Sequence, residues 1–349
     1  MKPQHKTGRT LLILAAVLLI LFLLSFRMGR YGVSTAETCR ILLDRLLELL
    51  SKLPGVPELG LRQTWDNSMA AVVLNVRLPR IVMACLVGCC LSAAGAAYQG
   101  VFQNPMASPD VLGASSGAAF GAALGILLGF GNSGVTAAAF AASLVTVVIV
   151  YLIGQRAPGG KVLNLVLAGM IVSALFNAGT SYIKLVADPN NQLPEITYWL
   201  MGSLNGTVCK EVLTILPVMA LGLIPLFLLR WKLNLLALGD DEARAMGVQP
   251  GRLRLAAVVC ATLVTAASIS VSGRICWVGL VMPHLCRKLV GSKFKVLLPA
   301  SMLAGAAFLL LVDDISRNLM AVEIPIGILT AVIGAPFFLY LLLRKEEGA

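Results

Sequence analysis

Long apolar runs separated by short polar stretches dominate the chain. The runs are close to the roughly 20 residues that an α-helix needs to cross the hydrocarbon core of a bilayer. With glycine, proline and charged residues taken as boundaries, the pattern predicts an all-α polytopic membrane protein of about ten spanning helices. The predicted helices cover residues 10–28, 70–100, 108–130, 134–154, 162–185, 208–230, 254–272, 275–291, 297–313 and 324–343.

The segment 29–68 is polar and interrupts these runs. Residues 35–50 have helical periodicity, and Pro54 and Pro57 then break the helix. We expect a short amphipathic helix at the outer membrane surface, followed by a turn. No other stretch is large enough for a soluble domain, so residues 1–349 are expected to form a single membrane domain.

An even number of spanning helices places both termini on the same side of the membrane. If that side is the cytoplasm, the inner loops and tails hold 16 of the 28 lysines and arginines. Positive charge favours the cytoplasmic side. We therefore expect a multi-pass protein of a prokaryotic inner membrane with both termini in the cytoplasm.

The composition excludes a soluble globular domain, because 58% of the residues are hydrophobic and only 13% are charged. The net charge of +11 comes mostly from basic residues that flank apolar runs, which favours membrane orientation over nucleic-acid binding. Most of the eight cysteines lie in or beside apolar runs as small apolar side chains. No Cys/His cluster predicts a metal site, and the spacing of Cys39 and Cys209 gives no framework for a disulfide.

One predicted helix carries glycine at every fourth position. Such spacing places the glycines on a single stripe, where a neighbouring helix can approach closely. Two interpretations stay open: tight helix packing, or a smooth border for the pathway of a bulky ligand. The glycines of the stripe are Gly113, Gly117, Gly121, Gly125 and Gly129.

Candidate catalytic groups are scarce. The only histidines are His5 and His284, and no pair of carboxylates lies in mid-membrane for a proton relay. Residues 159–161 resemble part of a phosphate loop, but positions 155 and 162 lack the glycine and the Ser or Thr of that motif. The sequence predicts no catalytic site and no nucleotide site, so the energy for transport is expected from a partner or a gradient.

Four charged residues gather near the outer end of the last two predicted helices: Asp313, Asp314, Arg317 and Glu323. One interpretation is a solvated group at the helix ends, in which the charges neutralise one another. The alternative is a docking surface for another protein.

A candidate docking segment for an external motor occupies residues 234–250. Asp240 is placed to cap a short helix and Gly247 to end it. Its apolar side chains are expected to offer a knob to a cleft in an ATPase, although a capped helix is also common in cytoplasmic loops. The residues assigned to this contact are Leu238, Gly239, Asp240, Glu242, Ala243, Met246 and Gly247.

A series of different short motifs lies along the chain from about residue 70 to the C-terminus. They are Arg77-Leu78-Pro79-Arg80, Gly95 with Gln99, Asn104-Pro105-Met106-Ala107, Pro109, Leu112-Gly113, Gly273-Arg274-Ile275, Val278-Gly279-Leu280, Pro283-His284, Arg287 and Glu323-Ile324-Pro325-Ile326-Gly327, followed by Gly334 and Pro336. Together with the docking segment, they resemble the FecCD-type permeases, the family of ABC importers for iron-siderophores, haem and cobalamin.

The resemblance implies the fold of a type II ABC importer permease. Two permease subunits, identical or paralogous, would enclose a pathway, an ATPase dimer would dock below, and an extracytoplasmic binding protein would deliver the ligand. ATP and Mg would bind to the ATPase, so this chain would be no enzyme and would hold no cofactor. The cargo would be a metal chelate, first a ferric siderophore as the commonest class, with haem or cobalamin as alternatives.

The resemblance also implies roles for individual residues. Arg77, Arg80 and Arg317 would receive acidic side chains of the binding protein, since a guanidinium pairs bidentately with a carboxylate. Anchoring at the membrane interface is the simpler alternative for the first two. An apolar gate that closes by dewetting would lie at the cytoplasmic end. The pathway and gate residues are Val162, Leu163, Asn164, Asn177 and Ser181.

A gradient-driven carrier and a membrane-embedded enzyme are the alternatives to a permease. A gradient-driven carrier would usually show a charged residue embedded in mid-membrane, and a membrane-embedded enzyme would need a clustered acid, base or metal set. Neither feature is evident in the sequence, which favours the permease.

Overall fold

The computed structural model describes residues 4–29, 31–51, 63, 65–158 and 160–343, which form helices joined by turns. The first elements are α1 (Gln4–Ser25), α2 (Thr35–Ser51), α3 (Asn67–Ala71), the π-helix η1 (Val72–Arg77), α4 (Leu78–Val101), the 3-10 helix η2 (Pro109–Leu112), α5 (Ala114–Leu127), α6 (Asn132–Arg156), α7 (Lys161–Val186) and α8 (Gln192–Met201). They are followed by α9 (Cys209–Leu229), α10 (Leu233–Leu238), α11 (Asp240–Ala245), α12 (Pro250–Ser272), α13 (Val278–Val290), α14 (Phe294–Asn318) and α15 (Ile326–Leu343).

The helices confirm an all-α polytopic membrane protein. In the described part of the chain, seven are long and apolar enough to cross a membrane, and α5 and α15 are shorter apolar helices. The remaining predicted span corresponds to α13, which has 13 residues. The apolar pattern does not predict α8, a ten-residue helix with Pro194 near its start.

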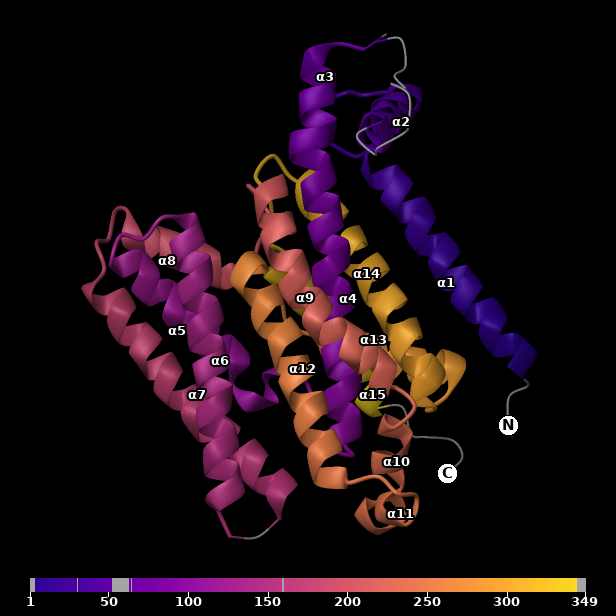
Figure 1. Ribbon diagram of the computed structural model, residues 1–349. Helices are drawn as coiled ribbons and strands as arrows, with labels where there is room; N and C mark the ends of the chain where they lie inside the picture. Colours follow the sequence, from indigo (N-terminus) through magenta and orange to yellow (C-terminus); the bar gives the residue numbers. More distant parts are fainter. Residues whose placement is uncertain (1–3, 30, 52–62, 64, 159, 344–349) are drawn as a thin grey trace.

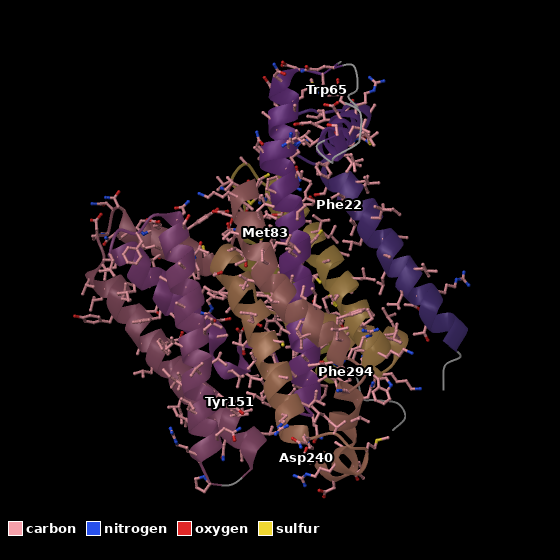
Figure 2. The ribbon with its side chains drawn as sticks, viewed as in Figure 1. Phe22, Trp65, Met83, Tyr151, Asp240 and Phe294 are labelled. Atoms are coloured by element: carbon pink, nitrogen blue, oxygen red, sulfur yellow. The ribbon has the colours of Figure 1, made fainter. Side chains whose placement is uncertain are left out.

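Helix α4 lies in the middle of the bundle, with α5 to α8 on one side and α1 on the other (Figure 1). Helices α10 and α11 lie at the lower end, where α1 also begins and α15 ends, while α2 and α3 lie at the upper end. Figure 2 places Asp240 at the lower end and Trp65 at the upper end. The lower end is the predicted cytoplasmic end, and the upper end is the predicted outer end.

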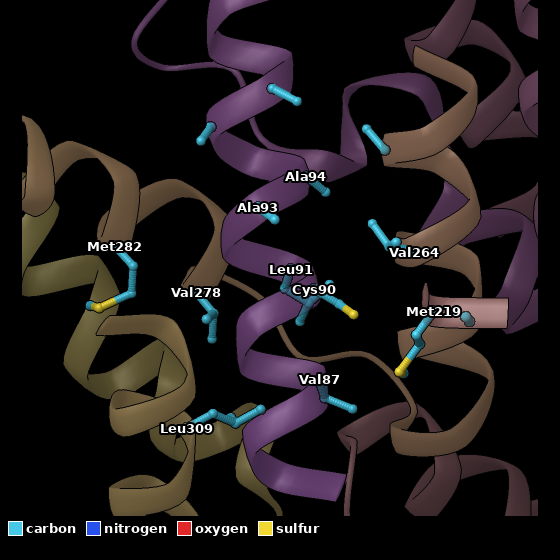
Figure 3. Close-up of a cluster of buried hydrophobic side chains, with 14 of the residues drawn as sticks. Val87, Cys90, Leu91, Ala93, Ala94, Met219, Val264, Val278, Met282 and Leu309 are labelled. Carbon is cyan, nitrogen blue, oxygen red and sulfur yellow. The ribbon is translucent and has the colours of Figure 1, made fainter. Parts of the chain in front are cut away.

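Helix α4 forms the centre of the core, because α9, α12, α13 and α14 pack around it. Figure 3 shows Cys90 and Leu91 of α4 among Met219 of α9, Val264 of α12 and Leu309 of α14. These side chains are all buried.

Two glycines bring the backbone of α4 directly against its neighbours. A Cβ atom at Gly88 would overlap the carbonyl oxygen of Gly305 in α14, and a Cβ atom at Gly95 would overlap that of Gly279 in α13. Membrane helices associate by such close approach of small residues, since lipid offers little hydrophobic gain for side-chain burial. The positions of α13 and α14 are therefore set by contact with the α4 backbone.

The π-helix before α4 has a physical cause in Pro79. Proline has no N–H, so the carbonyl oxygen of Asn75 loses its α-helical donor. The N–H of Leu78 donates to the carbonyl oxygen of Val73, five residues earlier, which is the π-helical pattern. This irregular turn carries Arg77 at the entrance to α4.

The helix predicted over residues 108–130 is shorter than expected. Gly113 has a left-handed φ of 75° between η2 and α5, and Gly129 has a φ of 73° beyond the end of α5. A left-handed residue cannot continue a right-handed helix, so the prediction of one five-glycine stripe was wrong at both ends.

The three glycines inside α5 do form the predicted packing stripe. A Cβ atom at Gly117 or Gly121 would overlap atoms of Thr146, Ala142 or Ala138 in α6. Gly125 lies in ordinary contact distance of α6. The stripe packs against α6 within the same chain, which favours the packing interpretation over a pathway border.

Helix α2 confirms the predicted amphipathic helix of the outer segment. Its start is a capping box: the N–H of Glu37 donates to Ser34 Oγ over 3.2 Å, and the N–H of Ser34 donates to the Glu37 carboxylate over 3.1 Å. These bonds with Ser34 hold the pKa of Glu37 below its usual value. Ile41 is buried, whereas Leu43 and Leu46 are exposed. The predicted breakers Pro54 and Pro57 lie outside the described residues.

The close contact between Gly95 and Gly279 predicts the direction of a stability change on substitution. Gly95→Ala is expected to destabilise the protein by about 1–3 kcal/mol, because backbone atoms occupy the space of the new methyl group. The matched control is Gly251→Ala in α12, where open space surrounds the glycine. That control should be neutral or stabilise by up to about 1 kcal/mol. Thermal unfolding of the two purified variants in detergent measures both, and equal midpoints would contradict the packing argument.

Candidate functional site

The candidate docking segment consists of two short helices rather than one. Gly239 separates α10 from α11 with a φ of 131°, and a Cβ atom there would overlap the Glu242 carboxylate. Only glycine adopts this backbone conformation without strain. Asp240 makes no side-chain cap, so its predicted capping role was wrong. Gly247, with a left-handed φ of 77°, lies just beyond the end of α11 and stops the helix there, as predicted.

Three polar contacts attach this segment to spanning helices. Gln103, just beyond α4, donates from Nε2 to the carbonyl oxygen of Leu236 over 2.5 Å. Asn234 Oδ1 accepts the N–H of Phe294, the first residue of α14, over 2.7 Å. These two hydrogen bonds join α10 to the end of α4 and to the start of α14.

The third contact attaches α11 to α12. Arg254 donates from Nη2 to the Asp240 carboxylate over 2.9 Å, and its side chain is only 13% exposed. Asp240 thus connects the segment to α12 instead of capping α11. The sequence does not point to Gln103, Asn234 or Arg254 at this site, because a polar residue at a helix end has many candidate partners.

The exposed face of the segment differs from the predicted apolar knob. Ala243 is completely buried, so it packs within the protein and its predicted outward position was wrong. Met246 is 59% exposed, and Glu242 is exposed beside it. The backbone of Leu238 ends α10, but its side chain lies outside the described part of the structure. The surface open to a partner is therefore mixed, with Met246 as its large apolar side chain.

The second candidate site is an ion-pair cluster at the outer end, and it is buried rather than solvated. Arg80 donates from Nε to Asp313 over 2.9 Å and from Nη1 to Glu323 over 3.0 Å. The Asp313 side chain is fully buried, and that of Arg80 is 7% exposed. The interpretation as a solvated helix-end group was wrong, although the charges do neutralise one another.

Two further arginines complete this cluster around the end of α1. Arg317 pairs with Asp313 over 3.2 Å, pairs with Asp314, and donates to Ser25 Oγ over 2.9 Å. Arg77 donates to the carbonyl oxygens of Phe26 and Tyr31, both over 2.5 Å.

Arg77 and Arg317 therefore hold the end of α1 against η1 and α14, while Arg80 links α4 to α14. Their guanidinium groups are engaged inside the chain, with residue exposures of 4%, 6% and 8% for Arg77, Arg80 and Arg317. A docking protein could reach them only by displacing these internal acceptors. Simple anchoring at the membrane interface also does not describe such buried groups.

The predicted pathway residues follow α7 and its preceding turn. Leu163 is 61% exposed, while Val162 is partly buried against the core. Asn164 donates to the carbonyl oxygen of Ala157 over 2.8 Å, which holds the turn between α6 and α7.

Higher on α7, Asn177 and Ser181 are exposed, and the Ser181 hydroxyl donates to the Asn177 carbonyl oxygen over 2.9 Å. Within this chain the five residues do not converge on one constriction, so a closed gate would require a second subunit.

Other predicted features have plain structural outcomes. Cys39 and Cys209 are free thiols and do not form a disulfide. Among the described residues, no group of three or more His, Cys, Asp and Glu side chains could hold a metal ion. An embedded acid that the sequence analysis missed is Asp110, which accepts a hydrogen bond from Ser115 at the turn before α5.

Fold and site together define an integral membrane protein of the transporter class, with a helical segment attached to three of its spanning helices. The model of the FecCD transport family matches residues 17–344, so the chain belongs to this family. It is a permease of the ABC importer type, as the motifs predicted, and not a carrier or an enzyme of another family.

Related proteins are similar in sequence to this chain over most of its length. The probable iron chelatin transport system permease protein of Helicobacter pylori strain 26695 is 41% identical over 80% of this chain and 85% of its own length. The molybdate import system permease protein MolB of Haemophilus influenzae is 37% identical over 99% of this chain and 97% of its own length. A solved inward-facing structure, assigned to a metal-chelate type ABC transporter, superposes with a TM-score of 0.83 and 36% identity over 96% of this chain and 99% of that one. This superposition confirms the predicted fold class.

The outer cluster can be tested by double substitution. Arg80→Leu should destabilise the protein by about 3–5 kcal/mol, because it removes one of the two cations that pair with the fully buried Asp313 and also the partner of Glu323. Arg80→Leu combined with Asp313→Leu should recover most of that loss, since neither charge then stays buried alone. Thermal unfolding of the wild type and of the two variants in detergent measures these changes in stability. Wild-type stability of the single variant would contradict the stabilising role of Arg80 in this cluster.

Proposed function

We propose that this chain is the membrane-spanning subunit of an ABC importer that moves a metal chelate, in the first instance a ferric siderophore, into the cytoplasm. The observation that carries the proposal is the attachment of α10 and α11 to α4, α12 and α14 in a member of the FecCD transport family. A segment attached in this way can convert movement of a docked protein into movement of spanning helices.

The proposed assembly contains a second permease subunit, an ATPase dimer and an extracytoplasmic binding protein. The ATPase would bind ATP and Mg and grip the exposed face of the segment, where Met246 and Glu242 are accessible. Two copies of the chain would face each other across the exposed side chains of α7, such as Leu163. An apolar constriction built from both copies could close by dewetting.

Docking of the binding protein through Arg77, Arg80 and Arg317 stays part of the proposal in a modified form. An acidic side chain of the binding protein would compete with Asp313, Asp314 and Glu323 for the guanidinium groups. Docking would then loosen the contact of α1 with α14, and the binding protein would act on the permease through this cluster.

The coupling role predicts a separation of ATP hydrolysis from transport. Gly239→Val should strongly reduce uptake in the reconstituted complex while the variant still inserts and the ATPase still hydrolyses ATP. The reason is that a side chain at φ 131° strains the joint between α10 and α11. Gly206→Val is the control, since Gly206 has a φ of 76°, open surroundings and a place far from the segment. Normal coupled uptake by Gly239→Val would refute the proposed coupling role.

The cargo can be identified by uptake into proteoliposomes that contain the complete importer and its binding protein. We expect ATP-dependent accumulation of a ferric siderophore and no accumulation of molybdate, on the basis of the iron chelatin relative. Molybdate is the second candidate, because MolB matches nearly the whole chain. Haem and cobalamin are further arms of the assay. Accumulation of molybdate alone would replace the proposed cargo without affecting the proposed coupling.

A further inference from the structure

A cavity of about 650 Å³ lies at the lower end of the bundle, beside the docking segment. Its walls come from α6 and α7 on one side and from α11 and α12 on the other. Figure 2 shows Tyr151 of α6 and Asp240 of α11 at the lower end, and both line the cavity. The cavity therefore opens near the predicted cytoplasmic surface of the membrane.

Positive charge dominates the lining. Three arginines, Arg244, Arg252 and Arg254, face a single carboxylate from Asp240. Arg244 pairs with Asp241, but both side chains are largely exposed, and such surface pairs contribute little. Arg252 is exposed at the first turn of α12. The lining therefore carries an excess of positive charge, which favours the binding of an anion.

Arg254 has an unused donor within this wall. Its Nη2 is held by Asp240 over 2.9 Å, while its Nε is buried and has no hydrogen-bond acceptor. A buried donor without a partner is costly, and a bound anion would satisfy it. The first turn of α12 adds N–H groups that no side chain caps, and such groups favour anions.

The remaining lining is apolar, which separates a lipid from a small free anion. Leu165, Leu255 and Val258 and the ring of Tyr151 form the apolar part of the cavity. Further up α12, Val259 is 55% exposed and continues this apolar surface toward the membrane interior. A free phosphate gains nothing from these side chains, whereas the glycerol and acyl chains of a lipid can cover them.

We propose that this cavity binds the phosphate headgroup of an anionic phospholipid, with the arginines on the phosphate and an acyl chain along α12. Basic pockets between spanning helices on the cytoplasmic side are suited to such headgroups. The bound phosphate lies against Arg244 and Arg252, while Asp240 keeps Nη2 of Arg254. The lipid thereby supports the joint between α11 and α12.

The test uses the purified full chain in detergent with phosphatidylglycerol, phosphatidylcholine or inorganic phosphate. Native mass spectrometry measures bound lipid, and thermal unfolding measures stabilisation. Phosphatidylglycerol should bind and stabilise, while the other two should not. Arg244→Gln combined with Arg252→Gln should weaken phosphatidylglycerol binding about thirtyfold, since each arginine near an anionic headgroup contributes roughly fivefold.

Two controls separate a built site from general surface charge. Lys293→Gln combined with Lys295→Gln removes the same charge from exposed positions at the start of α14, outside the cavity, and should leave binding unchanged. Asp240→Asn removes the negative charge from the lining but leaves an amide oxygen that can accept from Arg254 Nη2, so it should tighten binding, a gain that misfolding cannot produce. Equal losses in the two double variants, weaker binding by Asp240→Asn, or equal stabilisation by inorganic phosphate or phosphatidylcholine would each overturn the proposal. Stabilisation by the partner ATPase alone, without any lipid effect, would also overturn it.

Discussion

Backbone contact between α4 and its neighbours is the constraint on which the rest of the structure depends. In lipid, an apolar side chain gains little by moving from acyl chains to another helix, so association relies on close packing. Gly88 and Gly95 allow α4 to touch the backbones of α14 and α13 directly. Any larger side chain at these points would overlap backbone atoms of the neighbouring helix, so the helices would have to move apart.

The α4–α14 pair also links the two ends of the molecule. At the outer end, Arg80 of α4 pairs with Asp313 of α14, and at the lower end both helices meet α10 through Gln103 and Phe294. The pair is packed along its length, so these two helices connect the outer cluster with the lower end. This arrangement suits a permease that must respond to partners on both sides of a membrane.

Charge is handled differently at the two ends. At the outer end, three arginines and three carboxylates are mostly buried and pair within the chain, and Arg77 and Arg317 of this group hold the end of α1. At the lower end, Arg244, Arg252 and Arg254 outnumber the one aspartate in their cavity. Paired buried charges hold helices in one arrangement, whereas an excess of positive charge attracts an anionic ligand.

The sequence alone determined the membrane class, the approximate helices and the family, because apolar runs and short motifs are local properties of the chain. It also predicted that the helix of the candidate docking segment stops just before Gly247. Only the tertiary structure decided that Arg77, Arg80 and Arg317 are buried, that Ala243 points inward, and that Asp240 pairs with Arg254. Those outcomes depend on partners that lie far away in sequence, such as Asp313 for Arg80. Residue spacing carries no information about such partners, since a long charged side chain takes whichever partner the packed helices bring within reach.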